Sequence, residues 1–177
     1  MINTLPIFLK GNVCKGYGRG SKELGIPTAN LDDDVLQLLP SESTNGIYFG
    51  WAQVDSSPVY KMVMSIGWNP FYKNTKRSVE VHILHIFEED FYGSTVRVIV
   101  EGFLRNEQDF SSKEEMINQI KMDISIAEKK LLEKNFMEHL NYSFFLPSVN
   151  IEHQIENSEI TEKSNVNGFT NFVQSNI

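Results

Sequence analysis

The chain has 177 residues, of which 41% are hydrophobic and 22% charged, which is enough apolar material for one globular core. Its formal net charge of −7 repels phosphodiester backbones, so we do not expect a general nucleic-acid-binding protein. The single cysteine, Cys14, excludes an intrachain disulfide and a cysteine-rich zinc site, and we expect it to be a small buried residue.

The first ten residues contain neither a basic leader nor a small-residue cleavage site, which argues against a secretion signal. No apolar run approaches the roughly 18 residues of a membrane-spanning helix. The sequence therefore predicts a soluble, cytoplasmic protein that does not bind membranes.

Five segments are predicted to be strands because they are rich in β-branched and aromatic residues. They cover residues 8–15, 47–54, 59–66, 78–87 and 95–105. Turn chemistry joins them, as at Asp55-Ser-Ser-Pro58 and Tyr92-Gly93. No helical pattern separates these strands, so an antiparallel sheet or barrel is favoured over parallel βαβ units.

A helix is predicted after Ser111 and Ser112, each of which stands three residues before a glutamate in a capping-box pattern. One apolar stripe follows at steps of three and four residues, and we expect it to pack on the barrel. Its members are Ile117, Ile120, Ile124, Ala127 and Leu131.

The composition changes after residue 146, where Asn, Ser, Glu and Thr replace the periodic pattern. The sequence thus predicts one domain over residues 1–146 and a polar, mobile tail over residues 147–177.

The segment from Gly16 to Asn30 has four glycines, which can present backbone N–H groups to an anion, and two cations, Arg19 and Lys22. Pro27 excludes a P-loop and a dinucleotide-binding turn, because both lead into a helix. A phosphate-binding loop and an ordinary surface loop both fit the residues alone.

Thr28 and Asn30 are two apart in an extended stretch, so they point to the same side. Both carry hard oxygen ligands, and Mg²⁺ often takes only one or two from protein. A magnesium site and simple turn or capping roles remain open for this pair.

Glu80 shares one face of its predicted strand with His82, Leu84 and Ile86. A carboxylate in such apolar surroundings suits a general base that accepts a hydroxyl proton, although a structural ion pair or simple exposure also fits. His82 and His85 lie on opposite faces, so we interpret them as packing or edge residues.

Two further places could hold a ligand. The run Trp68-Asn-Pro-Phe-Tyr72 could stack on a planar ring or only pack in a turn. Arg105 and Phe110 border one connection, where a cation and a ring could clamp a ligand or be ordinary surface and packing residues.

Taken together, these residues closely resemble the monofunctional eukaryotic riboflavin kinase family. The motifs in family order are GYGRGSK at 16–22, LGIPTANL at 24–31, GIYFGWA at 46–52, MVMSIGWNPFYKNTK at 62–76, VEVHI at 79–83 and EDFYG at 89–93. They cover most of residues 8–110, and the glycine loop followed by Pro-Thr-Ala-Asn is the most specific of them.

The resemblance implies a mainly β fold, a six-stranded antiparallel Greek-key barrel with a C-terminal α-helix packed on it. It implies an enzyme that transfers the γ-phosphate of ATP to the 5′-hydroxyl of riboflavin, with Mg²⁺, for which Zn²⁺ or Mn²⁺ could substitute. A bacterial-type adenylyltransferase signature is absent, so the product is expected to be FMN. We expect a monomer.

The resemblance also implies a role for each matching residue. Glu80 would be the catalytic base, Gly16 and Lys22 would hold the ATP phosphates, and Thr28 and Asn30 would bind the metal and ATP. The adenine side would be Ile83, His85 and Tyr92, and the flavin side Arg105, Gln108 and Phe110. The alternatives are a flavin- or nucleotide-binding barrel without catalysis and, less compatible with the charge, a nucleic-acid-binding barrel.

Overall fold

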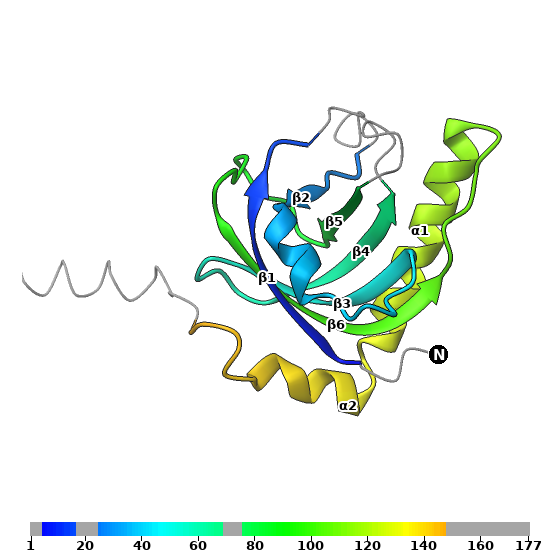
Figure 1. The fold of residues 1–177 in the computed structure, drawn as a ribbon. Helices are drawn as coiled ribbons and strands as arrows, with labels where there is room; N and C mark the ends of the chain where they lie inside the picture. The colour runs from blue at the N-terminus through cyan, green and yellow to red at the C-terminus, as the bar shows by residue number, and fades with distance from the viewer. Residues whose placement is uncertain (1–4, 17–24, 69–75, 148–177) are drawn as a thin grey trace, which may run out of the picture. The chain divides into compact units, whose positions relative to one another are not determined.

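The computed structural model describes residues 5–16, 25–68 and 76–147. Six antiparallel strands close into a barrel in the order β1-β2-β5-β4-β3-β6 (Figure 1). The strands are β1 (Ile7–Cys14), β2 (Ala29–Leu31), β3 (Gly46–Val54), β4 (Tyr60–Trp68), β5 (Arg77–Ile83) and β6 (Thr95–Arg105). The predicted antiparallel barrel is therefore confirmed.

The connections of β3 to β6 form a Greek key. The strands β3, β4 and β5 pair in succession, and β6 returns to lie beside β3. A short 3₁₀ helix, η1 (Asp33–Leu38), follows β2 and places Val35 in the barrel interior. Each strand thus has two neighbours, and the barrel has no open edge.

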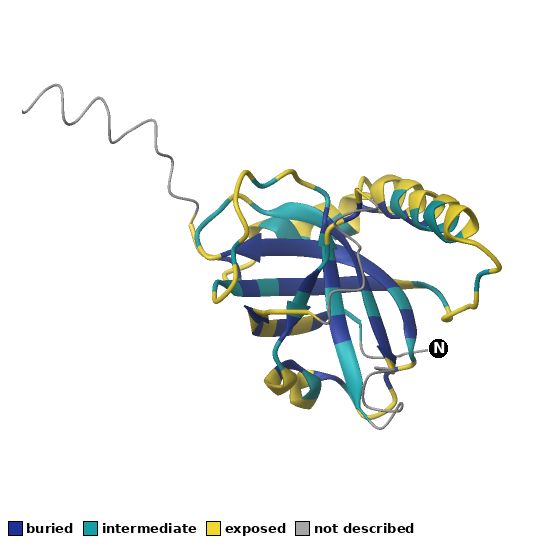
Figure 2. Ribbon diagram, turned by 90° about the horizontal axis from the view of Figure 1, so that it is seen from above, coloured by how far each residue is buried: buried dark blue, intermediate teal, exposed yellow. Residues whose placement is uncertain are grey.

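Two apolar layers stabilise this fold. One fills the barrel with inward-facing side chains such as Leu9, Met64 and Val81, all of them buried. The other lies outside the barrel, where Phe49, Val63 and neighbouring side chains meet the C-terminal helix. Figure 2 shows this pattern as buried strands beneath a helix whose outer side is exposed.

The predicted helix is α1 (Lys113–Lys130), and it packs on the outer layer through Ile124, Ala127 and the following Leu131. The Ser112 hydroxyl accepts a hydrogen bond from the Glu115 backbone at 3.1 Å. The Glu115 carboxylate accepts bonds from Ser111, which lower the pKa of this carboxyl. The capping pattern and the apolar stripe both act as the sequence indicated.

The segment after α1 was not predicted as structured. It forms α2 (Lys134–Met137) and η3 (Glu138–Asn141) and then returns along the barrel. The side chain of the buried Gln53 donates to the Leu146 carbonyl at 2.7 Å and accepts from the Leu146 N–H at 2.8 Å. The Trp51 indole donates to the Phe136 carbonyl at 3.0 Å, so the barrel holds this segment at several points.

Two details differ from the prediction. The strand expected over residues 78–87 ends at Ile83, because the chain bends there, and Ile86 is 90% exposed. Cys14 was expected to be buried, but it is exposed, because strand alternation turns it away from the interior that Val13 faces.

The chain divides into two units, Met1–Pro147 and Ser148–Ile177, and the second lies outside the described residues. In the parts of the chain that the structure describes, no helix is both long and apolar enough to cross a membrane.

Two truncations test which part of the C-terminal segment stabilises the barrel. Ending the chain after Pro147 should change the melting temperature by less than about 2 °C, because no described contact is lost. Ending it after Ser143 also removes Phe145, which is only 7% exposed, and the Leu146 partner of Gln53. Burial of a phenylalanine is worth about 2–3 kcal/mol, so this protein should melt roughly 5–10 °C lower. Equal melting temperatures for the two truncations would show that the segment around Phe145 does not stabilise the barrel.

Candidate active site

Glu80 lies in a row of paired residues that runs around the outer face of the barrel. The row comprises Cys14 on β1, Asn30 on β2, Glu80 on β5, Ser65 on β4, Ile47 on β3 and Arg105 on β6. Side chains at directly paired positions point to the same face of a sheet. The barrel thus brings Glu80, Asn30 and Arg105, which lie far apart in the sequence, onto one surface.

The Glu80 carboxylate is half-buried and has the Thr28 hydroxyl beside it. The Thr28 Oγ1 donates to Glu80 Oε2 at 3.2 Å, across 52 residues of sequence. His82, two residues after Glu80, holds the backbone just before Thr28. Its Nδ1 lies 2.7 Å from the Pro27 carbonyl oxygen, to which it donates in the matching tautomer. Glu80 is thus held at the surface, where a hydroxyl of a substrate can reach it.

Asn30 is the direct neighbour of Glu80, and the backbone of Gly16 passes close to its side chain. A Cβ atom at Gly16 would lie 2.3 Å from Asn30 Nδ2, so any larger residue here would displace the Asn30 side chain. Thr28 and Asn30 therefore offer a hydroxyl and an amide oxygen from one stretch of chain beside the Glu80 carboxylate. Two such neutral oxygens fit Mg²⁺, which completes its coordination with phosphate oxygens and water. No group of three His, Cys, Asp or Glu residues suited to a metal occurs among the described residues.

The predicted phosphate loop is described only at its ends. Gly16 lies at the end of β1 beside Asn30, and Gly25 has the positive φ of 72° that glycine tolerates best. Arg19 and Lys22 lie outside the described residues. The same holds for Asn69 to Tyr72 in the aromatic run that begins at Trp68.

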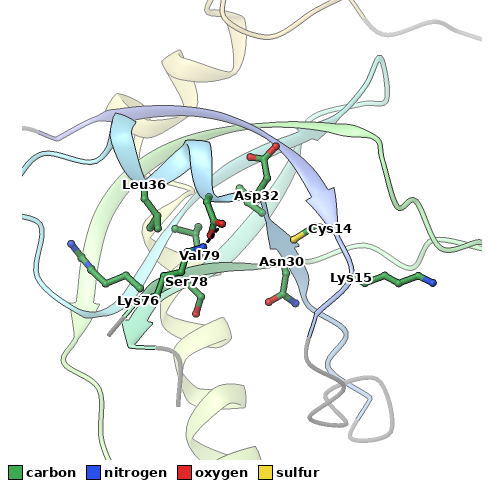
Figure 3. Close-up of a pocket in the computed structure, with 11 residues that line it drawn as sticks. Cys14, Lys15, Asn30, Asp32, Leu36, Lys76, Ser78 and Val79 are labelled. Carbon is green, nitrogen blue, oxygen red and sulfur yellow. Dashed lines mark hydrogen bonds and ion pairs between the residues drawn. The ribbon is translucent and has the colours of Figure 1, made fainter. Parts of the chain in front are cut away.

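A pocket of about 170 Å³ opens beside Asn30 (Figure 3). It occurs where β2 ends after three residues while the facing strand β5 continues to Arg77. Its lining residues are Cys14, Lys15, Asn30, Leu31, Asp32, Asp33, Leu36, Lys76, Arg77, Ser78 and Val79. Pockets that enclose a whole cofactor-sized ligand are about 300–1,000 Å³, so this one has room for only part of a substrate.

The three residues predicted on the adenine side lie at and beyond the end of β5. The Ile83 side chain is buried in the barrel interior, whereas His85 is exposed and Tyr92 is 56% exposed. The His85 ring stacks on Tyr60 with ring centroids 4.1 Å apart, and Phe87 meets it edge-on at 4.8 Å. The structure thus adds Tyr60 and Phe87, both partly buried against the barrel core, as the aromatic neighbours of the exposed His85, which the sequence interpretation missed.

The residues predicted on the flavin side follow β6. The Arg105 guanidinium binds Asp123 of α1, and its centre lies 6.0 Å from the centroid of the Phe110 ring. Gln108 is exposed. In the same loop the Glu107 carboxylate lies over Gly67 of β4, where a Cβ atom would be 2.1 Å from Glu107 Oε1. The loop is therefore folded over the outer face on which Glu80 lies.

The row also gives the distance between Glu80 and the residues predicted on the flavin side. Arg105 is three strands from Glu80 in the row, and adjacent strands lie about 4.8 Å apart, so roughly 14 Å of barrel surface separates them. An elongated molecule could contact Glu80 with one end and Arg105 with the other.

The described geometry agrees with the comparisons with known proteins. A family model described as Flavokinase: Riboflavin kinase matches residues 3–131. The chain is 54% identical over 136 residues to the riboflavin kinase of Homo sapiens, with 77% of this chain and 86% of that protein covered. It is 43% identical over 145 residues to the riboflavin kinase of Pyricularia oryzae, with 73% and 72% covered.

A solved structure leads to the same family. The crystal structure of riboflavin kinase from Trypanosoma brucei matches with a TM-score of 0.66 and 31% identity, over 84% of this chain and 95% of that one. The sequence relatives and the solved structure each match this chain over most of its length. The chain therefore belongs to the riboflavin kinase family.

Proposed function

We propose that this chain transfers the γ-phosphate of ATP to the 5′-hydroxyl of riboflavin, giving FMN and ADP, on the outer face of its barrel. The observation that carries the proposal is the row in which Asn30, Glu80 and Arg105 lie on adjoining strands. Riboflavin has a flat ring and a ribityl chain that ends in the 5′-hydroxyl. With that hydroxyl at Glu80, the ring would extend toward Arg105.

Glu80 is the proposed general base. Its carboxylate would accept the proton of the 5′-hydroxyl as the oxygen bonds to the γ-phosphorus and the bond from that phosphorus to the β-γ bridging oxygen breaks, which releases ADP. Phosphoryl transfer asks for little covalent chemistry from the protein, so positioning and charge neutralisation carry most of the catalysis. The hydrogen bond from Thr28 aligns the carboxylate for this role.

Thr28 and Asn30 would hold the divalent cation, which we propose to be Mg²⁺, with Mn²⁺ or Zn²⁺ as substitutes. When bound, this ion neutralises charge on the transferring phosphoryl group. The two residues suit it because they lie beside Glu80 and add no further negative charge.

The remaining ATP contacts are assigned by position. Gly16 and Lys22 would bind the phosphates, and the close approach of Gly16 to Asn30 supports this for the described end of the loop. His85 and Tyr92 would line the adenine with their side chains, and Ile83, whose side chain is buried in the barrel interior, with its backbone alone. The exposed His85 ring, stacked on the partly buried Tyr60, supports this, since a purine stacks well on such rings.

Arg105, Gln108 and Phe110 would contact the flavin. The loop that carries Gln108 and Phe110 already lies over the end of β4, close to the ring position that the row implies. We further propose a monomer in the cytoplasm, a reducing compartment that the single, free and exposed Cys14 suits.

The direct test is to incubate the purified chain with riboflavin, ATP labelled at the γ-phosphate and Mg²⁺, and to separate the flavins by chromatography. The expected result is labelled FMN and unlabelled ADP in equal amounts. Lumiflavin, which has the ring without the ribityl hydroxyls, should give no labelled flavin. Flavin binding without phosphate transfer would instead indicate a non-catalytic flavin-binding barrel.

A further inference from the structure

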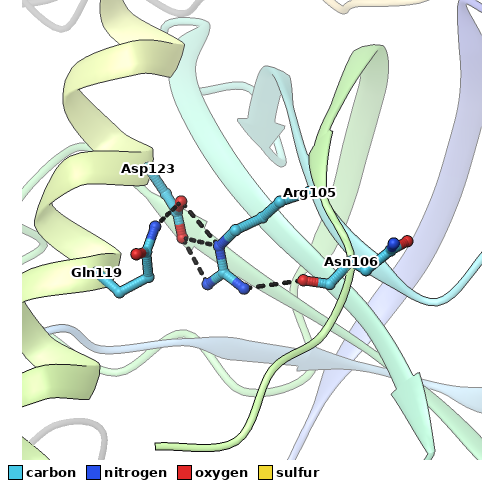
Figure 4. Close-up of polar contacts among 4 residues, drawn as sticks. All are labelled: Arg105, Asn106, Gln119 and Asp123. Atoms are coloured by element: carbon cyan, nitrogen blue, oxygen red, sulfur yellow. Dashed lines mark hydrogen bonds and ion pairs between the residues drawn. The ribbon is translucent and has the colours of Figure 1, made fainter.

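Asp123 is a buried carboxylate in the middle of α1, on the side of the helix that faces the barrel. Its side chain is only 3% exposed and binds Arg105 at the end of β6 (Figure 4). Arg105 Nε lies 3.0 and 3.1 Å from the two Asp123 oxygens, and Arg105 Nη2 lies 2.8 Å from Oδ2. Gln119, one turn earlier, donates to Asp123 Oδ1 at 3.0 Å. The carboxylate is therefore fixed from two sides.

The rest of the guanidinium faces the loop that follows β6. Arg105 Nη1 donates to the Asn106 carbonyl at 2.9 Å, and the Phe110 ring lies 6.0 Å away. Three of the five guanidinium N–H groups are thus used by Asp123 and Asn106. Asp123 fixes the plane of the Arg105 guanidinium. It therefore also sets the direction of the two remaining N–H groups and the position of the start of the loop.

Stability alone is a weak reason for such a pair. A buried ion pair often contributes no more than well-packed apolar residues of the same volume, because both charges lose their hydration. This pair joins α1 to the point where the barrel strand meets the loop of Gln108 and Phe110. Glu107 of that loop rests on Gly67, so the loop is anchored at its first two residues.

We propose that Asp123, supported by Gln119, is a positioning residue for riboflavin. It acts through Arg105 and the loop that begins at Asn106, without touching the substrate itself. The inference rests on the proposed function, and it assigns to α1 a role in the affinity for the flavin. ATP binds on the other side of Glu80, beside β2, so its affinity should not depend on Asp123.

The test is the Asp123→Asn variant, which keeps the size of the side chain and removes its charge. The KM for riboflavin should rise about 10- to 100-fold, the order that a displacement of about 1 Å by a remote substitution costs, while the KM for ATP stays within about twofold. Glu128→Gln makes the same chemical change at an exposed position of α1 and should leave both KM values unchanged. A purely structural role would lower the melting temperature and the active fraction, and leave both KM values alone.

Two further variants decide the matter if Asp123→Asn does not fold. Gln119→Ala keeps both charges and removes only the support of Asp123, and it should raise the KM for riboflavin by about two- to fivefold. In a double-mutant cycle that combines Gln119→Ala with Arg105→Lys, the double variant should bind riboflavin no more weakly than Arg105→Lys alone. An unchanged riboflavin KM in Gln119→Ala, or effects that multiply in the cycle, would overturn the inference. Absence of FMN formation by the parent chain would instead overturn the proposed function.

Discussion

Replacing Glu80 by glutamine is expected to lower kcat by about 10²–10⁴-fold while the affinities for ATP and riboflavin change little. The substitution keeps the size of the side chain and its bond with Thr28, but an amide cannot take up the hydroxyl proton. Steady-state kinetics with each substrate varied in turn would give kcat and both KM values on one preparation.

Thermal melting of the same preparation separates catalysis from structure. If Glu80 instead neutralised a buried cation, its loss would cost about 3–5 kcal/mol of stability and the variant would melt far below the parent. Glu128→Gln, exposed on α1, serves as the control for the chemical change itself. A Glu80→Gln protein that melts like the parent and retains a near-normal kcat would remove Glu80 from the mechanism.

Replacing Thr28 by valine should raise the Mg²⁺ concentration needed for half-maximal activity and lower kcat/KM for ATP by about 10- to 100-fold. The change keeps the shape of the side chain and removes its hydroxyl, and a hydrogen bond to a charged group is worth about 1.5–3 kcal/mol. The valine variant thus loses both the proposed metal ligand and the donor to Glu80. Activity measured as a function of Mg²⁺ at saturating riboflavin would show the shift.

Thr28→Ser is the matched control, because serine keeps the hydroxyl and should restore most of the activity. Ser65→Ala removes a hydroxyl beside Glu80 on the β4 side, where we expect no change in the metal requirement. A valine variant with the Mg²⁺ dependence of the parent would remove Thr28 from the metal site.

The long strands were predictable because their signal is local. Residues 47–54 and 95–105 are rich in β-branched and aromatic residues, and the structure places β3 and β6 within one residue of these bounds. The strand β2 has only three residues, Ala29–Leu31, with little intrinsic preference for a sheet. It exists because β1 and β5 pair with it on either side, which no local pattern reveals.

The site was predictable to a smaller extent. Thr28 and Asn30 stand out as oxygen ligands beside a glycine loop, and Glu80 as a carboxylate in an apolar strand. Their closeness depends on the antiparallel pairing of β2 with β5, which joins residues about 50 positions apart. Only the family resemblance supplied that relation in advance, because the residues by themselves left structural roles open.

Two omissions had signals that could have been used. Asp123 lies within the apolar stripe of α1, between Ile120 and Ala127, and a charge in that position requires a buried partner. The segment that becomes α2 and η3 carries Phe136, Leu140 and Phe144 at four-residue steps, and all three pack against the outer layer. Its two short helices, which follow each other directly, lack the caps and length that mark α1.

The most direct test of the account is a crystal structure of the protein with ADP, Mg²⁺ and FMN bound. The account predicts that the phosphate ester oxygen of FMN lies about 2.6–3.2 Å from the Glu80 carboxylate. It also predicts Thr28 and Asn30 at the metal, and the flavin ring beside Arg105 and Phe110. A flavin bound with its ester oxygen away from Glu80, or with its ring on the side of His85 and Tyr92, would contradict it.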